Sequence, residues 1–96
     1  MQEHLQFYIN GEWVDPATPA TLDVINPATE QPFATISMGS AADVEKAVAA
    51  ATQAFDSFST TTVAERVELL GAILAEYTKR YDDIAHAIST EMGAPI

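Results

Sequence analysis

The sequence contains no cysteine and only 4 basic residues, against 14 acidic ones, in a chain of 96 residues. Without cysteine these residues can form no disulfide, no thiolate metal site and no cysteine nucleophile. A few scattered cations in a chain of net charge −10 cannot neutralise a run of phosphates. We therefore expect no nucleic-acid partner and no anionic membrane partner.

Long apolar runs are also missing. No uninterrupted apolar stretch approaches the roughly 18 residues that a membrane span needs. The N-terminal residues 1–4 lack the basic patch and the apolar stretch of a signal peptide, so a cytoplasmic location is expected. The hydrophobic fraction of 48% is ordinary for a folded protein, and the length leaves room for one domain at most.

The first half of the chain predicts two β-hairpins over residues 5–38. Asn10-Gly11 between β-prone residues is a strong signal for a two-residue turn, since both positions must accept a positive φ. That turn fixes the register and places Tyr8 opposite Trp13 on one face. The second hairpin is expected to consist of Thr21–Asn26, a turn over Pro27–Glu30, and Phe33–Met38.

The second half, residues 40–93, predicts three helices. Ser40 with Asp43, and Thr62 with Glu65, have the spacing of capping boxes at the starts of the first two helices. The third helix is expected to be capped by Asp82 or Asp83 and to end at Gly93. Apolar residues that are expected to face a core recur at helical spacing in three sets: Val44, Ala47, Val48, Ala51, Phe55 and Phe58; Val67, Leu70, Leu74, Tyr77 and Tyr81; and Ile84, Ala85, Ile88 and Met92.

Candidate catalytic groups are few, and each has a simpler structural interpretation. His4 and His86 lack convergent partners and are expected to be surface or structural residues. The Ser- and Thr-rich segment 57–62 has no accompanying base or nucleophile elbow and is interpreted as a connector with an N-cap. Gly39-Ser40 before a helix could receive a phosphate, but the glycine-rich fingerprint is absent and Asp43 would repel the anion. The residues alone therefore name no function.

Several segments form an ordered pattern that runs along almost the whole chain. They are Phe7–Trp13, Val24–Glu30, Ala34–Ile36, Ala41–Val44, Ala47–Ala51 with Phe55, Ala64–Arg66 and Glu91–Pro95. Together they resemble the opening of the NAD(P)-dependent aldehyde dehydrogenase superfamily. Members of that family are several times longer than this chain. The resemblance places the nucleophilic cysteine, the general-base glutamate, the oxyanion-hole asparagine and the cofactor-binding turn downstream, so no catalytic or cofactor-binding residue is assigned here.

The resemblance implies both a fold and a parent reaction. The fold is an α+β segment, with N-terminal β-hairpins followed by three helices, at the start of an α/β, Rossmann-like cofactor-binding domain. Residues 1–96 would all belong to that domain, and the catalytic and oligomerisation parts would be absent. The parent enzyme would be a homo-oligomer that oxidises an aldehyde to a carboxylic acid with NAD or NADP through a cysteine thioester. We expect this chain to be a truncated, inactive portion of such an enzyme.

One site is implied by the resemblance. Several family members hold a structural monovalent cation near the Ile-Asn-Pro segment, partly through backbone carbonyls, and Ile25 is the matching position. Those members have an aspartate where this chain has Met92, before Gly93. Because a thioether is a poor ligand for a hard cation, we expect the site to be weakened or absent here.

A different class of function is left open by the sequence. The chain could be a self-sufficient, non-catalytic α+β module for interaction or oligomerisation, folding cooperatively as it stands. Its contacts would then be made through Phe7, Trp13 or the apolar residues of the second helix. A native stop codon after Ile96 together with a cooperative melt would favour this alternative, whereas a cysteine nucleophile encoded downstream would favour the enzyme.

Overall fold

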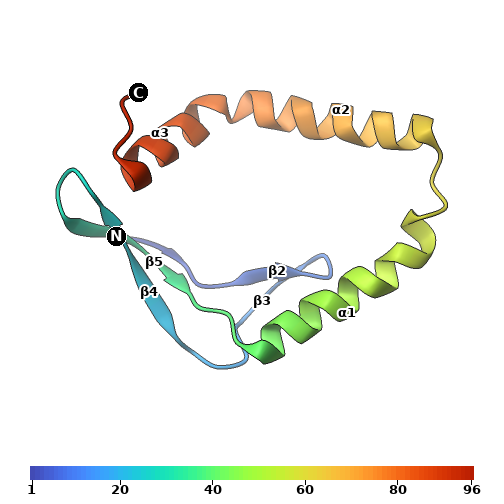
Figure 1. Ribbon diagram of the computed structural model, residues 1–96, viewed down its shortest axis with the longest axis horizontal. Coiled ribbons are helices and arrows are strands. Elements are labelled where there is room, and N and C mark those ends of the chain that lie inside the picture. Colours follow the sequence, from blue (N-terminus) through green and yellow to red (C-terminus); the bar gives the residue numbers. More distant parts are fainter.

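The computed structural model describes residues 1–96 as five strands followed by three helices (Figure 1). The strands are β1 (Gln2–His4), β2 (Phe7–Ile9), β3 (Glu12–Val14), β4 (Thr21–Asn26) and β5 (Gln31–Ser37). The helices are α1 (Ala41–Phe58), α2 (Val63–Lys79) and α3 (Tyr81–Met92). The predicted α+β order of strands and helices is confirmed.

The β2–β3 hairpin has the predicted register. Asn10 and Gly11 both adopt a positive φ, of 55° and 77°, as a two-residue turn of this kind requires. Tyr8 pairs with Trp13 in the antiparallel register, and their ring centroids lie 5.1 Å apart. Local turn chemistry is therefore sufficient to define this element.

The remaining strands form a three-stranded sheet in the order β1-β5-β4. β4 and β5 form the predicted antiparallel hairpin, whereas β1 runs parallel to β5, from Gln2 opposite Ala34 to His4 opposite Ile36. Both predicted hairpins lie within the range 5–38, and β1 is an additional strand that was not predicted. Ala34, on the central strand between two neighbours, is the one buried hydrophobic residue, with 3% of its surface exposed.

The first two helices begin as predicted, with complete capping boxes at Ser40 and Thr62. The predicted cap of the third helix is wrong: α3 begins at Tyr81, and the residue before it, Arg80, makes no side-chain capping bond. The Arg80 N–H donates to carbonyls of α2, so no extended residue separates the two helices to serve as an N-cap. Asp82 and Asp83 lie instead in the first turn, where carboxylates favour the helix dipole.

The chain forms a flat, open frame with extents of 48 × 34 × 16 Å (Figure 1). α1 contacts β2, α3 contacts β4, and α2 contacts no element except α3. Only Ala34 and Asp43 are buried. The apolar sets on α1 and α2 are exposed in this chain, whereas Ile84 and Ala85 of the α3 set are half-buried on the helix that contacts β4.

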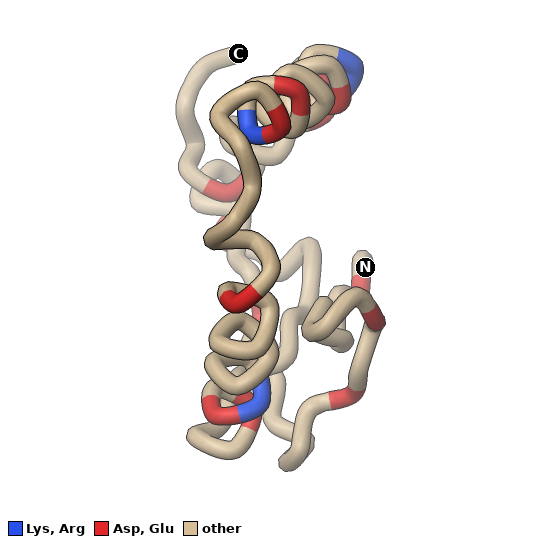
Figure 2. The backbone as a smooth tube through the Cα atoms, turned by 90° about the vertical axis from the view of Figure 1, so that its right-hand side faces the viewer, with Lys and Arg blue, Asp and Glu red and all other residues tan.

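The charged residues follow the same open arrangement. Acidic residues occur on strands and helices alike, whereas the basic residues lie on the helices and at the α2–α3 junction (Figure 2). The four basic residues do not form a patch. None of the helices combines the length and the hydropathy that crossing a lipid bilayer requires.

Candidate functional site

Ile25, the residue proposed to ligate a cation, lies in β4 at an irregularity of the sheet. The register of β4 against β5 shifts between Val24 and Ile25. The residue opposite Ile25 is Pro32, which has no N–H and so cannot donate to the Ile25 carbonyl. This end of β4 lies beside α3 (Figure 1).

The end of α3 packs closely against the residue that follows β4. Gly93 adopts a left-handed conformation with φ 76°, and its N–H donates to the Ser89 carbonyl at 2.9 Å. A Cβ at Gly93 would lie 3.1 Å from Cγ of Pro27, which is tighter than ordinary van der Waals contact. The Ser89 hydroxyl donates to the Ala94 carbonyl at 2.6 Å and closes the helix end. The fold thus brings together the two segments from which the family resemblance would build its cation site.

The groups present at this junction do not fit a cation site. Met92 offers only a thioether, and 73% of its surface is exposed. No group of three or more His, Cys, Asp or Glu side chains lies close enough together anywhere in the chain to hold a metal ion. One backbone carbonyl beside a thioether is a poor donor set for a hard cation, which needs several oxygens. The role of Ile25 therefore stays a prediction.

Asp43 forms the most connected polar cluster of the chain, at the start of α1. One carboxylate oxygen accepts the Ala17 N–H at 2.9 Å, and the other accepts the Ser40 N–H and the Ser40 hydroxyl at 3.0 Å each. Asp43 is buried, with 5% of its surface exposed. The Ser40 and Ala17 N–H groups stabilise the carboxylate and hold the pKa of Asp43 below its ordinary value of 3.8.

The Asp43 cluster disfavours phosphate binding at the N-terminus of α1. Its carboxylate already occupies the N–H of Ser40 and brings a negative charge to the position that an anion would take. The capping interpretation of Gly39-Ser40 is confirmed. The additional bond to Ala17 was not predicted, because the two residues are 26 positions apart and no local pattern connects them.

The two histidines lie on the surface, as predicted. Both His4 and His86 are exposed, and both line an open groove that also includes Asp83 and Thr90. The His4 ring Nε2 lies 3.4 Å from the Gln2 side-chain oxygen. The structure brings the histidines to one groove but does not assemble a metal site or a catalytic pair there.

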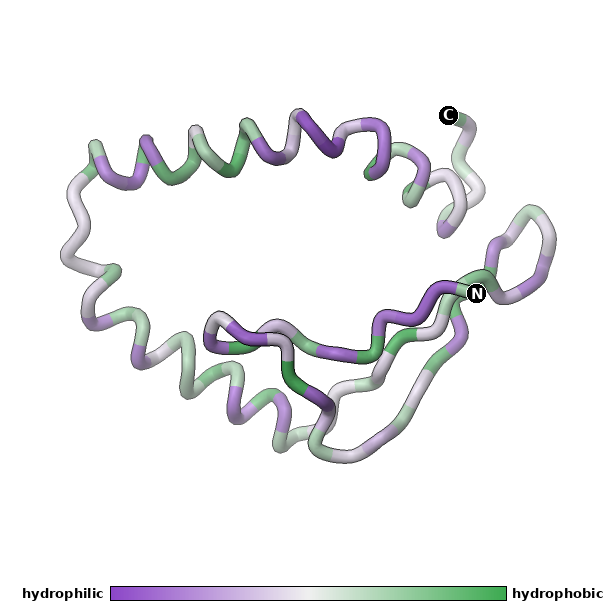
Figure 3. Tube along the Cα trace, turned by 180° about the vertical axis from the view of Figure 1, so that it is seen from behind, coloured by the Kyte–Doolittle hydropathy of each residue, from purple (hydrophilic) through white to green (hydrophobic).

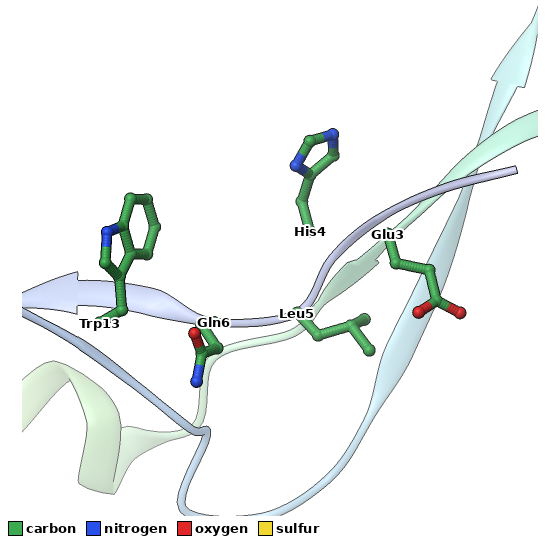
Figure 4. Close-up of a pocket in the computed structure, with 5 residues that line it drawn as sticks. All are labelled: Glu3, His4, Leu5, Gln6 and Trp13. Carbon is green, nitrogen blue, oxygen red and sulfur yellow. The ribbon is translucent and has the colours of Figure 1, made fainter.

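A hollow of about 330 Å³ beside the first strands contains one of these histidines and an aromatic residue (Figure 4). His4 and Trp13 point to the same side of the chain, whereas Glu3 and Leu5 point to the other (Figure 4). The Gln6 side-chain amide donates a hydrogen bond to the Asp15 carboxylate at 3.1 Å. No nucleophile, base and oxyanion donor converge among these five residues.

The hydroxyl groups of the connector between α1 and α2 form hydrogen bonds at the ends of these helices. The Thr60 and Thr61 hydroxyls donate to the carbonyls of Ser57 and Phe58, at 2.8 Å each. The Arg66 Nε–H donates to the Thr61 hydroxyl at 3.0 Å. These contacts, with the capping box of Thr62 and Glu65, agree with the interpretation of the segment as a capped connector.

Comparisons with known proteins indicate the same family over nearly the whole chain. The family model described as "Aldehyde dehydrogenase family" matches residues 13–96. A Staphylococcus aureus protein named as an aldehyde dehydrogenase is 48% identical over all 96 residues, and a Staphylococcus haemolyticus relative with the same description is 47% identical. The chain spans only 20% of the length of each of these relatives.

Two solved structures share the conformation of the chain. A crystal structure of aldehyde dehydrogenase from Bartonella henselae matches 99% of the chain with a TM-score of 0.97 at 49% identity, and the match covers 20% of that protein. A variant of aldehyde dehydrogenase C from Pseudomonas syringae, in complex with NAD+ and octanal, matches 93% of the chain with a TM-score of 0.90 at 46% identity. The match covers 18% of that protein.

Proposed function

The chain belongs to the aldehyde dehydrogenase family, and from this premise we propose that it is the N-terminal portion of an enzyme that oxidises an aldehyde to a carboxylic acid. The observation that carries the proposal is that the similarity covers all of this chain but only 20% of the relative's length. The 96 residues have no cysteine and no assembled site, so the chemistry belongs to residues outside them.

The proposed reaction is the one that the family resemblance implies. A cysteine thiolate in the rest of the enzyme attacks the aldehyde carbonyl, a hydride leaves the carbon, and water hydrolyses the resulting thioester to the acid. NAD+ or NADP+, when bound, accepts that hydride. A cytoplasmic homo-oligomer is proposed as the state of the whole enzyme.

The residues of this chain would have a structural role in that enzyme. The Asp43 cluster joins the loop before β4 to the start of α1, and Gly93 against Pro27 joins the end of α3 to the sheet. The proposed carbonyl ligand Ile25 lies beside the second of these contacts. We assign no catalytic residue to the segment.

We expect the full-length protein to form reduced nicotinamide when it is given an aldehyde, and the 96-residue chain to form none. The test is the absorbance of the reduced cofactor, with octanal and shorter aldehydes as substrates and NAD+ and NADP+ compared. The 96-residue preparation must be free of longer species by intact mass. Turnover by that preparation, or no turnover by a folded full-length protein with any aldehyde tried, would contradict the proposal.

A further inference from the structure

Two helices present large apolar side chains that nothing in the chain covers. We use the term α2 stripe for Val63, Val67, Leu70, Leu74 and Tyr77, whose exposed fractions lie between 48% and 75%. We use the term α1 stripe for Val44, Val48, Phe55 and Phe58, whose exposed fractions lie between 49% and 65%. Figure 3 shows hydrophobic residues recurring along both helices.

The α2 stripe occupies one side of its helix. With about 100° between successive residues, its five members fall within a narrow arc. Glu65, Glu68, Glu76 and Lys79 cluster around the opposite side, while Arg66 lies at the edge of the stripe and Leu69 and Ile73 widen the apolar side. A helix that is apolar on one side and charged on the other typically packs its apolar side against another apolar surface. α2 contacts only α3, so that surface is not supplied by the strands or by α1.

On α1, as on α2, the large apolar side chains are left uncovered. Four alanines, Ala47, Ala50, Ala51 and Ala54, line a shallow groove together with the β2–β3 turn at Asn10-Gly11. Around the helix, Ala51 falls among the members of the α1 stripe, and the other three alanines lie to one side of it. The hairpin therefore lies beside the small residues of α1, and the large apolar side chains of the α1 stripe stay exposed.

The identity of the partner follows from how much of the protein lies outside these residues. The chain covers 20% of its relatives, so about four fifths of a protein of that length would belong to the same polypeptide. A covalently attached partner is present at a high effective concentration and outcompetes a second copy for the same face. The same open conformation occurs within a solved relative whose chain is about five times as long, since the match covers 20% of it.

We propose that the α1 and α2 stripes are the surfaces on which the downstream part of the same polypeptide, beyond Ile96, packs. This inference rests on the proposed function and makes it more specific, because it assigns these helices to an interface within one subunit. The proposed occupant is an apolar layer of that downstream part, because neither stripe offers charged groups for a polar partner.

Thiol accessibility on α2 tests this assignment in the full-length protein. The variant is Leu70→Cys, and the matched control is Glu68→Cys on the charged side of the same helix. The natural sequence of this region has no cysteine, so a peptide spanning α2 carries only the introduced thiol. We expect maleimide labelling at position 70 to be on the order of a hundredfold slower than at position 68, because labelling would require a local opening.

Two further conditions identify the occupant. In the 96-residue chain we expect the thiols at positions 70 and 68 to react at similar rates. Equal rates in the folded full-length protein would overturn the inference. Protection that disappears when the full-length protein is diluted to a monomer would also overturn it, because a second copy would then be the occupant. Protection that persists in the monomer would support it.

Side-chain footprinting with hydroxyl radicals provides a measurement that needs no substitution. Leu70, Leu74 and Tyr77 are expected to be modified much less in the full-length protein than in the 96-residue chain, and equal modification would contradict the inference. The outcomes separate this inference from the proposed function. A full-length protein with protected stripes but no aldehyde oxidation would overturn only the function. One that oxidises aldehydes while its stripes react freely would overturn only the interface.

Discussion

Replacing Gly93 with alanine is expected to destabilise the full-length protein by about 2–4 kcal/mol. Gly93 adopts φ 76°, and a left-handed conformation costs an ordinary L-residue about 1–2 kcal/mol. The added Cβ would also lie 3.1 Å from Cγ of Pro27, so the Pro27 side chain would have to move by a few tenths of an ångström. The measurement is the free energy of unfolding from denaturant titration.

A matched control separates the two causes. Gly11 has nearly the same φ, 77°, but nothing lies within 4 Å of its Cβ position. Gly11→Ala should therefore cost only about 1–2 kcal/mol, the conformational part. Pro27→Ala in the Gly93→Ala background should recover part of the difference, as a double-mutant cycle would show. Equal losses at Gly11 and Gly93 would mean that the Pro27 contact contributes nothing.

Replacing Asp43 with asparagine is expected to lower the melting temperature at neutral pH more than neutralising any exposed carboxylate of the chain. The substitution removes the charge that the Ser40 and Ala17 N–H groups stabilise, and it replaces one of the two accepting oxygens with a donor. The control is Glu45→Gln, on the same helix and exposed. Differential scanning calorimetry of the full-length protein measures both.

The sign of the pH dependence follows from the direction of the Asp43 pKa shift. Because the pKa is lower in the folded state than its ordinary value of 3.8, the folded state binds the proton less readily. The stabilisation is fully present above that ordinary value and is lost as the pH falls through the folded-state pKa. The difference between wild type and Asp43→Asn should therefore be constant near neutral pH and shrink in acid. A difference that grows in acid would contradict this account of the cluster.

The parts of the fold that the sequence predicted correctly are those set by neighbouring residues. The β2–β3 register follows from Asn10-Gly11, because a two-residue turn leaves only one pairing. The starts of α1 and α2 follow from a hydroxyl residue and an acidic residue three positions later. The left-handed end of α3 follows from Gly93 in the same way.

The parts that were missed depend on residues far apart or outside the chain. β1 has a polar sequence and pairs with a strand about thirty residues later, so no local pattern indicates it. The hydrogen bond from the Ala17 N–H to Asp43 also joins residues far apart in the sequence, so no local pattern predicts it. The exposure of the helix stripes could not be predicted because periodicity shows which side of a helix is apolar, but not which element covers it. The proposed site residue, Ile25, came only from the family resemblance.

The central claim is that these 96 residues are part of a larger fold and not a self-sufficient module. The most direct test is thermal unfolding of the purified 96-residue chain, followed by circular dichroism and accompanied by light scattering. We expect a gradual, non-cooperative loss of helical signal, since only Ala34 and Asp43 are buried and a cooperative transition requires a common core. A sharp cooperative transition from a 96-residue monomer would contradict the claim.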